Sequence, residues 1–171
     1  MTEALSPRLA TRLLFGAIAG FAATVAMTSA MARLHRRLPR GERYPLPPLE
    51  IIEQGMGIQG PVARDTAMAA HFLYGGLCGA LVGAFRPEPG IAEGGAAGVA
   101  IWAGSYFGWV PALGILRPAS EHPRRRNALM IGAHLIWGTA TAITLRELYL
   151  ARKTMLADGP VRDARELATG Q

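Results

Sequence analysis

The sequence predicts an all-α membrane protein: a bundle of four transmembrane helices, with a short interfacial amphipathic helix between the first and second spans. Three observations predict this class. Half of the 171 residues are hydrophobic. Only 18% are charged, against about a quarter in soluble domains. Four windows long enough to cross a bilayer contain no Asp, Glu, Lys or Arg, namely residues 13–32, 66–85, 94–116 and 127–145.

The first span follows two arginines and ends in the small residues AMA at 30–32, a pattern that imitates a signal peptide. Cleavage there would send the arginines of residues 33–43 outward, against the positive-inside tendency. We therefore expect the first helix to be retained. Residues 1–156 are predicted to form a single four-helix domain, and residues 157–171 a flexible polar tail.

The polar segment between the first two spans contains YPLPPLEIIEQGMG, which indicates a proline-fixed entry followed by a short helix. Pro48 suits a first helical position. An apolar side is formed by Leu49, Ile51, Ile52 and Met56. A short amphipathic helix between membrane helices is expected to lie in the membrane interface.

Residues 86–93 are predicted to form a tight Pro/Gly turn and residues 117–126 a basic loop, and the last helix is expected to continue past the span into water until Gly159. Four spans place both termini on one side of the membrane. The first and third loops hold ten Lys and Arg and the opposite side holds eight, which favours cytoplasmic loops one and three in a bacterial inner membrane. Because the arginines flank apolar segments, the net charge of +6 predicts lipid and not nucleic acid as the partner. Further candidate partners are a second copy of the chain, through self-association, or a larger membrane complex.

Every span carries a stripe of small residues four positions apart, which lie on one side of a helix. Helices in lipid associate by close backbone approach at such residues. We predict helix packing at Gly16, Gly20, Gly75, Gly79, Gly83, Gly104, Gly108 and Gly138. Pro111 is expected to kink the third span near Gly108.

Two histidines, His71 and His134, lie on these stripes and therefore face protein. Counted from the ends of spans two and four that share one side of the membrane, they lie roughly 8 and 11 Å deep, in the same leaflet. Polar and aromatic residues predicted to support them are Thr24, Thr28, Ser105, Tyr106, Trp109 and Trp137.

Several roles for the two histidines remain open from the sequence. Neutral imidazoles can bridge helices by hydrogen bonds, and histidine can also sense or relay protons near neutral pH. Ligation of a haem or a transition metal, or a place in a substrate pathway, are further alternatives. The common nucleotide-, metal- and serine-hydrolase motifs are absent, so we expect neither an enzyme nor a bound cofactor, although Ser105 with a histidine base is conceivable as a nucleophile. The single Cys78 excludes an internal disulfide framework and a cysteine-based zinc site.

Four stretches resemble the YagU-like family of small bacterial inner-membrane proteins: YPLPP, HFLYGGLCGALVGAF, WVPALGILRP and AHLIWG. The resemblance covers about residues 13–148 and implies an association with acid resistance, with no known enzyme activity or cofactor. It also implies histidine at positions 71 and 134, followed by Trp137, whereas the first connection is shorter than that of the family. We therefore expect a pH- or acid-stress-related membrane protein that acts through His71 and His134. The alternatives are an accessory subunit of a larger membrane complex, or a haem- or metal-binding membrane protein.

Overall fold

The computed structural model describes residues 8–154, and every regular element in that range is a helix, which confirms the all-helical class. The predicted tail at residues 157–171 lies outside the described residues. The α-helices are α1 (Leu9–Arg36), α2 (Pro47–Met56), α3 (Gly60–Phe85), α4 (Ile91–Gly104), α5 (Val110–Ala112) and α6 (Arg124–Thr154). Two 3₁₀ turns, at Arg40–Glu42 and Ala119–Glu121, and a π-helical turn at Ser105–Trp109 complete the elements.

Three of these helices, α1, α3 and α6, are long and apolar enough to cross a membrane, with mean hydropathies of 1.8, 1.5 and 1.5 over 18-residue windows. Each begins before the span that the sequence predicts, since polar residues at the ends continue the helix. The region of the predicted third span is divided. Its α-helix α4 has 14 residues, fewer than the roughly 20 needed for a spanning helix, and the chain then enters the π-helical turn.

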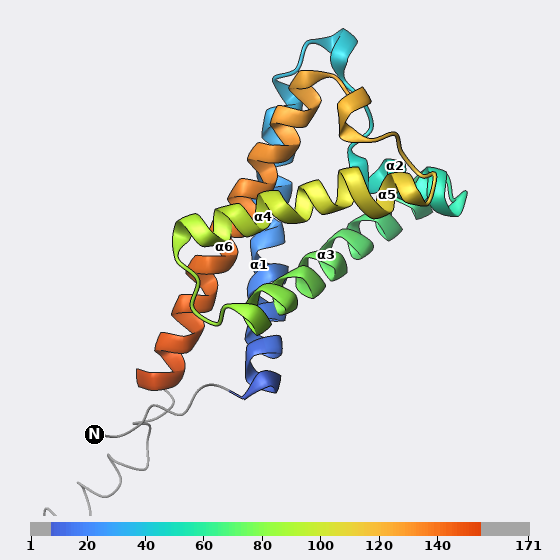
Figure 1. The fold of residues 1–171 in the computed structure, drawn as a ribbon. Coiled ribbons are helices and arrows are strands. Elements are labelled where there is room, and N and C mark those ends of the chain that lie inside the picture. Colours follow the sequence, from blue (N-terminus) through green and yellow to red (C-terminus); the bar gives the residue numbers. More distant parts are fainter. Residues whose placement is uncertain (1–7, 155–171) are drawn as a thin grey trace, which may run out of the picture.

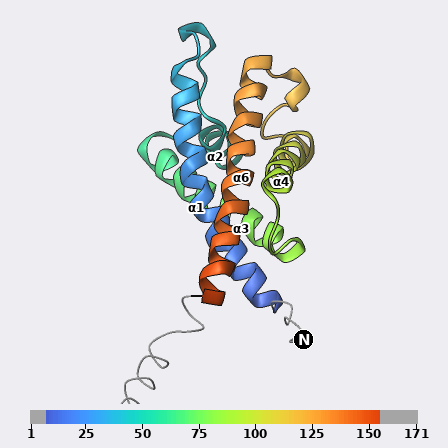
Figure 2. The same cartoon turned by 90° about the vertical axis from the view of Figure 1, so that its left-hand side faces the viewer.

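Helix α1 packs against both α3 and α6, and α4 packs against α6. Figure 1 shows α3 and α4 running at a steep angle to α1 and α6, and Figure 2 shows α1 and α6 crossing each other at the centre of the molecule. Because α3 and α4 contact each other little, the molecule is open between them.

Glycines bring the backbones together at two helix crossings, that of α1 with α3 and that of α4 with α6. A Cβ added to Gly79 of α3 would lie 2.6 Å from the Gly20 Cα of α1, and one added to Gly20 would lie 2.7 Å from the Gly79 Cα. On the other pair, a Cβ on Gly138 of α6 would lie 2.8 Å from the carbonyl carbon of Gly94 in α4. Gly16, Gly75 and Gly83 extend the first crossing. Backbones therefore meet directly, as expected for helices that associate in lipid.

Gly104 and Gly108 depart from the predicted packing role. A Cβ added to either would meet nothing within 4 Å. Gly104 lies six residues after Gly98 and therefore on another side of α4 from the packed Gly94 and Gly98. Gly108 lies inside the π-helical turn, where its dihedral angles are not helical. The kink predicted near Pro111 is confirmed, because the chain leaves helical dihedral angles at Gly108 (φ −110°, ψ −109°).

Polar contacts group the connections at two ends of the molecule. At one end, the Lys153 Nζ of α6 lies 3.3 Å from Glu88 Oε1 in the turn between α3 and α4. At the other end, Arg125 Nη1 at the start of α6 lies 2.7 Å from Glu42 Oε1 in the connection between α1 and α2. The start of α1 therefore shares an end with the α3–α4 turn and with the end of α6, as Figure 1 shows.

Helix α2 lies against α3. Its first two residues are Pro47 and Pro48. Gly57 caps its C-terminal end with a positive φ of 69°, the left-handed conformation that glycine adopts most readily. Ile52 is buried with Ala63 and Ala67 of α3, and Leu49 packs against this cluster. Met56, predicted on the same apolar side, is exposed.

Candidate functional site

A cavity of about 270 Å³ lies where all six α-helices meet, and both His71 and His134 line it. His71 comes from α3 and His134 from α6, so their nearness depends on tertiary packing. The volume lies just below the usual range for small-molecule sites, which is about 300–1,000 Å³. Five of the six predicted supporting residues line the same cavity: Thr24, Ser105, Tyr106, Trp109 and Trp137.

His134 is held by its own helix. Its side chain is 9% exposed, and its Nδ1–H donates to the Met130 carbonyl oxygen over 2.8 Å. In a neutral imidazole the other nitrogen, Nε2, is then an acceptor. The backbone is fixed as well, because Gly98 of α4 packs directly against the His134 carbonyl group.

His71 is less constrained. Among the described residues, its buried Nε2 atom has no hydrogen-bond partner. Its ring makes an edge contact with the neighbouring Phe72, with 6.2 Å between the ring centroids. A buried polar atom without a partner is uncommon in folded proteins, so this nitrogen is a candidate to meet a ligand or water inside the cavity.

Tyr74 and Ser105 connect α3 to the π-helical turn. The Ser105 hydroxyl donates to the Ile101 carbonyl oxygen over 2.9 Å, and Tyr74 Oη lies 3.0 Å from Ser105 Oγ. Because serine has one hydroxyl proton, Tyr74 is the donor in this pair. The Tyr74 ring also contacts Trp109, with 6.0 Å between centroids. Single-turn π segments occur often at functional sites, and this one supplies Ser105, Tyr106 and Trp109 to the cavity wall.

Trp137 and Thr24 join α6 to α1 beside the cavity. The indole Nε1–H of Trp137 donates to the Gly20 carbonyl oxygen over 3.1 Å and lies 3.3 Å from Thr24 Oγ1. Thr24 in turn donates to the same Gly20 oxygen over 2.7 Å. Thr28, predicted to support the histidines, does not line the cavity, and its hydroxyl donates to the Thr24 carbonyl oxygen of its own helix.

The sequence did not indicate the buried ion pair beside this cavity. Arg126 of α6 makes a two-bond contact with the Glu50 carboxylate of α2, one N···O distance being 3.2 Å. The side chains are only 8% and 12% exposed. The Arg126 guanidinium also stacks over the Tyr44 ring, 4.4 Å from its centroid. The one available signal was Glu50 itself, a lone charge among the apolar residues of LEII.

Burial and Arg126 affect two groups in the connecting loops. Burial raises the pKa of Tyr44 above its ordinary value, and the positive charge of Arg126 opposes this only in part. The pKa of His122 is lowered, first by burial and then by repulsion from Arg126. His122 is therefore neutral over more of the pH range than an exposed histidine, and its Nε2–H donates to the Arg117 carbonyl oxygen over 3.0 Å.

The cavity offers few ligands for a metal ion. Within residues 8–154, no group of three or more His, Cys, Asp and Glu side chains is placed to hold one. A metal held by His71 and His134 would take its remaining ligands from a bound molecule or water. In the part of the chain that the structure describes, the titratable groups of the cavity wall are the imidazoles of His71 and His134, the phenols of Tyr74 and Tyr106, and the thiol of Cys78.

No family model, curated protein or solved structure matches this chain. The resemblance to the YagU-like family stays a prediction. A functional assignment therefore depends on the geometry of the cavity and on the chemistry of its lining.

Proposed function

We propose that this is a four-span protein of the bacterial inner membrane in which His71 and His134 respond together to proton concentration. One observation carries the proposal: imidazoles from α3 and α6 line a single cavity. A stress-related role in acid, which the family resemblance implies, follows from the same chemistry. Histidine is the side chain whose ordinary pKa places its charge change between about pH 5 and 8.

The cavity lining provides no compensation for added positive charge. The other titratable groups that face the two imidazoles are Tyr74 and Cys78 from α3 and Tyr106 from the π-helical turn, and none is a carboxylate. Helices α1 and α2 contribute no titratable side chain to the cavity. The pair Arg126–Glu50 lies beyond Tyr106, where each charge neutralises the other.

Double protonation would change the cavity in two ways. Two like charges would repel in a medium where they are weakly screened. His134 Nε2 would also change from acceptor to donor while Nδ1 keeps its bond to Met130, so the ring would need a new acceptor. The expected response is a wider separation of α3 from α6 and entry of water or an anion.

The four-span arrangement is supported by length and by the grouping of the ends. From Ile91 to Ala112 the helical residues would span at most about 33 Å at about 1.5 Å per residue, before the bend at Gly108 shortens the run, against the roughly 30 Å of hydrocarbon in a bilayer. The two groups of connections at opposite ends fit an even number of spans. We place α2 at the membrane interface, and we place the end of the molecule that contains the Arg125–Glu42 contact in the cytoplasm.

Spin-label distances test the proton response. Leu73 of α3 and Leu135 of α6 are exposed and lie within two residues of His71 and His134 in the sequence. Spin labels on cysteines at these two positions report the α3–α6 separation, and Cys78→Ala removes the native thiol. Lowering the pH from about 8 to about 4 is expected to lengthen or broaden the distance distribution. His71→Gln and His134→Gln are expected to remove the change, and His35→Gln, outside the cavity, to keep it. A distribution that is independent of pH in the histidine-containing protein would contradict the proposal.

A further inference from the structure

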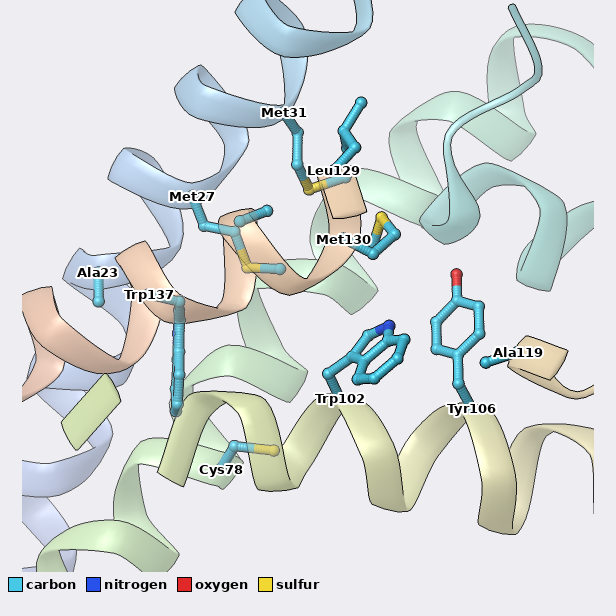
Figure 3. Close-up of a cluster of buried hydrophobic side chains, with 11 residues drawn as sticks. Ala23, Met27, Met31, Cys78, Trp102, Tyr106, Ala119, Leu129, Met130 and Trp137 are labelled. Atoms are coloured by element: carbon cyan, nitrogen blue, oxygen red, sulfur yellow. The ribbon is translucent and has the colours of Figure 1, made fainter. Parts of the chain in front are cut away.

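The cavity contains a second buried group with an unused donor besides His71 Nε2. Tyr106 is 3% exposed, and its hydroxyl lies beside the Arg126 guanidinium, which can donate to it but cannot accept its proton. Among the described residues, no acceptor is placed to receive the Tyr106 O–H. Figure 3 shows this hydroxyl pointing away from its helix, to the side of the cluster on which Met130 lies. Both groups can donate a proton, since the tautomer of His71 can place its N–H at Nε2. The cavity thus presents two unused donors from different elements.

Most of the remaining wall is apolar or aromatic, and its other polar side chains, Thr24, Tyr74, Ser105 and His134, each make a hydrogen bond within the protein. Trp109 and Trp137 contribute rings, and Met27, Met31 and Met130 contribute thioethers that pack well against aromatic ligands. Within residues 8–154, no Asp, Glu, Lys or Arg side chain lines the cavity. A charged ligand would therefore lose its hydration without gaining an opposite charge. The wall fits a neutral, planar molecule that brings hydrogen-bond acceptors.

Such a molecule can reach the cavity from the bilayer. A second hollow of about 290 Å³ lies between α3 and α4, and it shares Cys78 and Ile101 with the cavity. Its wall includes Leu81 and Phe85, which are exposed on the outer surface of α3. In a membrane this surface faces lipid, so an apolar molecule could enter sideways between the two helices.

We propose that the cavity binds the ring of an uncharged lipophilic quinone. Quinones are planar, dissolve in the bilayer and carry two carbonyl oxygens, which can accept bonds from the Tyr106 hydroxyl and from His71 Nε2–H. The small volume suits a one- or two-ring head group, with any tail lying in the hollow between α3 and α4. This binding concerns the neutral cavity and is independent of the proton response of the two histidines.

A pair of matched probes tests the role of the carbonyl groups. Menadione is a methylated naphthoquinone, and 2-methylnaphthalene has the same rings without the two carbonyl oxygens. The full-length protein in lipid nanodiscs is equilibrated with each probe by dialysis at about pH 8, where histidine is neutral. Empty nanodiscs measure the partition into lipid, which is subtracted. We expect the protein to bind menadione at least about tenfold more tightly than the hydrocarbon.

Variants then test the two donors. Tyr106→Phe and His71→Leu are each expected to weaken menadione binding roughly three- to tenfold, the effect of one hydrogen bond. Tyr149→Phe is the control, because Tyr149 is also buried with an unpartnered hydroxyl but lies outside the cavity. Equal binding of the two probes to the unaltered protein would overturn the proposal and assign the cavity to hydrocarbon chains. Equal menadione binding in all variants would overturn it as well. In either case a pH-dependent change of spin-label distance would still stand.

Discussion

Replacing Glu50 by leucine is expected to lower the free energy of unfolding by about 3–5 kcal/mol, the usual cost of leaving one partner of a buried ion pair unpaired. Arg126 is 8% exposed and pairs with Glu50 through both of its terminal nitrogens. The Tyr106 hydroxyl also lies beside the guanidinium, but it carries no charge, so among the described residues no second carboxylate is in place to neutralise Arg126. Without Glu50, the guanidinium must either draw in water or leave the protein interior.

Loss of this pair should also displace α2. Glu50 is the residue of α2 that bonds to α6, while Pro47, Pro48 and Ile51 of the same helix line the cavity. Detergent or denaturant unfolding, followed by tryptophan fluorescence, measures the loss of stability. The double variant Glu50→Leu/Arg126→Leu is expected to recover most of it, because no unpaired charge remains.

The exposed pair Arg125–Glu42 provides a matched control. It joins the same end of α6 to the connection between α1 and α2, with an N···O distance of 2.7 Å, but the two side chains are 64% and 43% exposed. Glu42→Gln is expected to cost less than about 1 kcal/mol, since exposed ion pairs are strongly screened. A cost for Glu50→Leu no larger than that for Glu42→Gln would show that the Arg126 site is hydrated.

A methyl group at Gly79 is expected to separate α1 from α3. The added Cβ of Gly79→Ala would lie 2.6 Å from the Gly20 Cα and 2.8 Å from the Gly20 nitrogen, so backbone must move. Overpacking of this kind costs about 1–3 kcal/mol and sometimes more. Here the cost is expected at the upper end, because rigid backbone and not a flexible side chain occupies the space.

Gly104→Ala is the matched control for this substitution. Gly104 is also helical, but its added Cβ would meet nothing within 4 Å. Alanine has the higher helix propensity, so this variant is expected to be neutral or slightly more stable. Unfolding midpoints of the two alanine variants, measured in the same detergent, decide the matter. Similar midpoints would mean that the α1–α3 crossing is looser than the structure shows.

Much of the helical architecture could be predicted because it depends on local periodicity. Spacing of four residues places Gly16 and Gly20 on one face of α1, and Gly75 and Gly79 on one face of α3, and these faces meet. The prediction failed at Gly104, which is six and not four residues after Gly98, and at Gly108, which lies in the π-helical turn, where the residue period changes. Pro111 indicated a break there, although it could not specify the form of the break.

The site was predictable only in part. The predicted depths of His71 and His134 placed both in the same leaflet, and the structure brings them to one cavity. Contacts between distant elements left no local pattern. Arg126 pairs with Glu50 across 76 residues, and Tyr74 bonds to Ser105 across 31. Such pairings follow from how the helices cross, which spacing within one helix does not determine.

Because His71 and His134 line one cavity, each is expected to affect the protonation of the other. The most direct test is solid-state NMR of the protein with isotope-labelled histidine in lipid bilayers, titrated from about pH 8 to about pH 4. We predict that His71→Gln changes the pH at which His134 titrates, that His134→Gln changes the titration of His71, and that His35→Gln changes neither. Titration curves of the two histidines that stay the same when the other is replaced would contradict the claim.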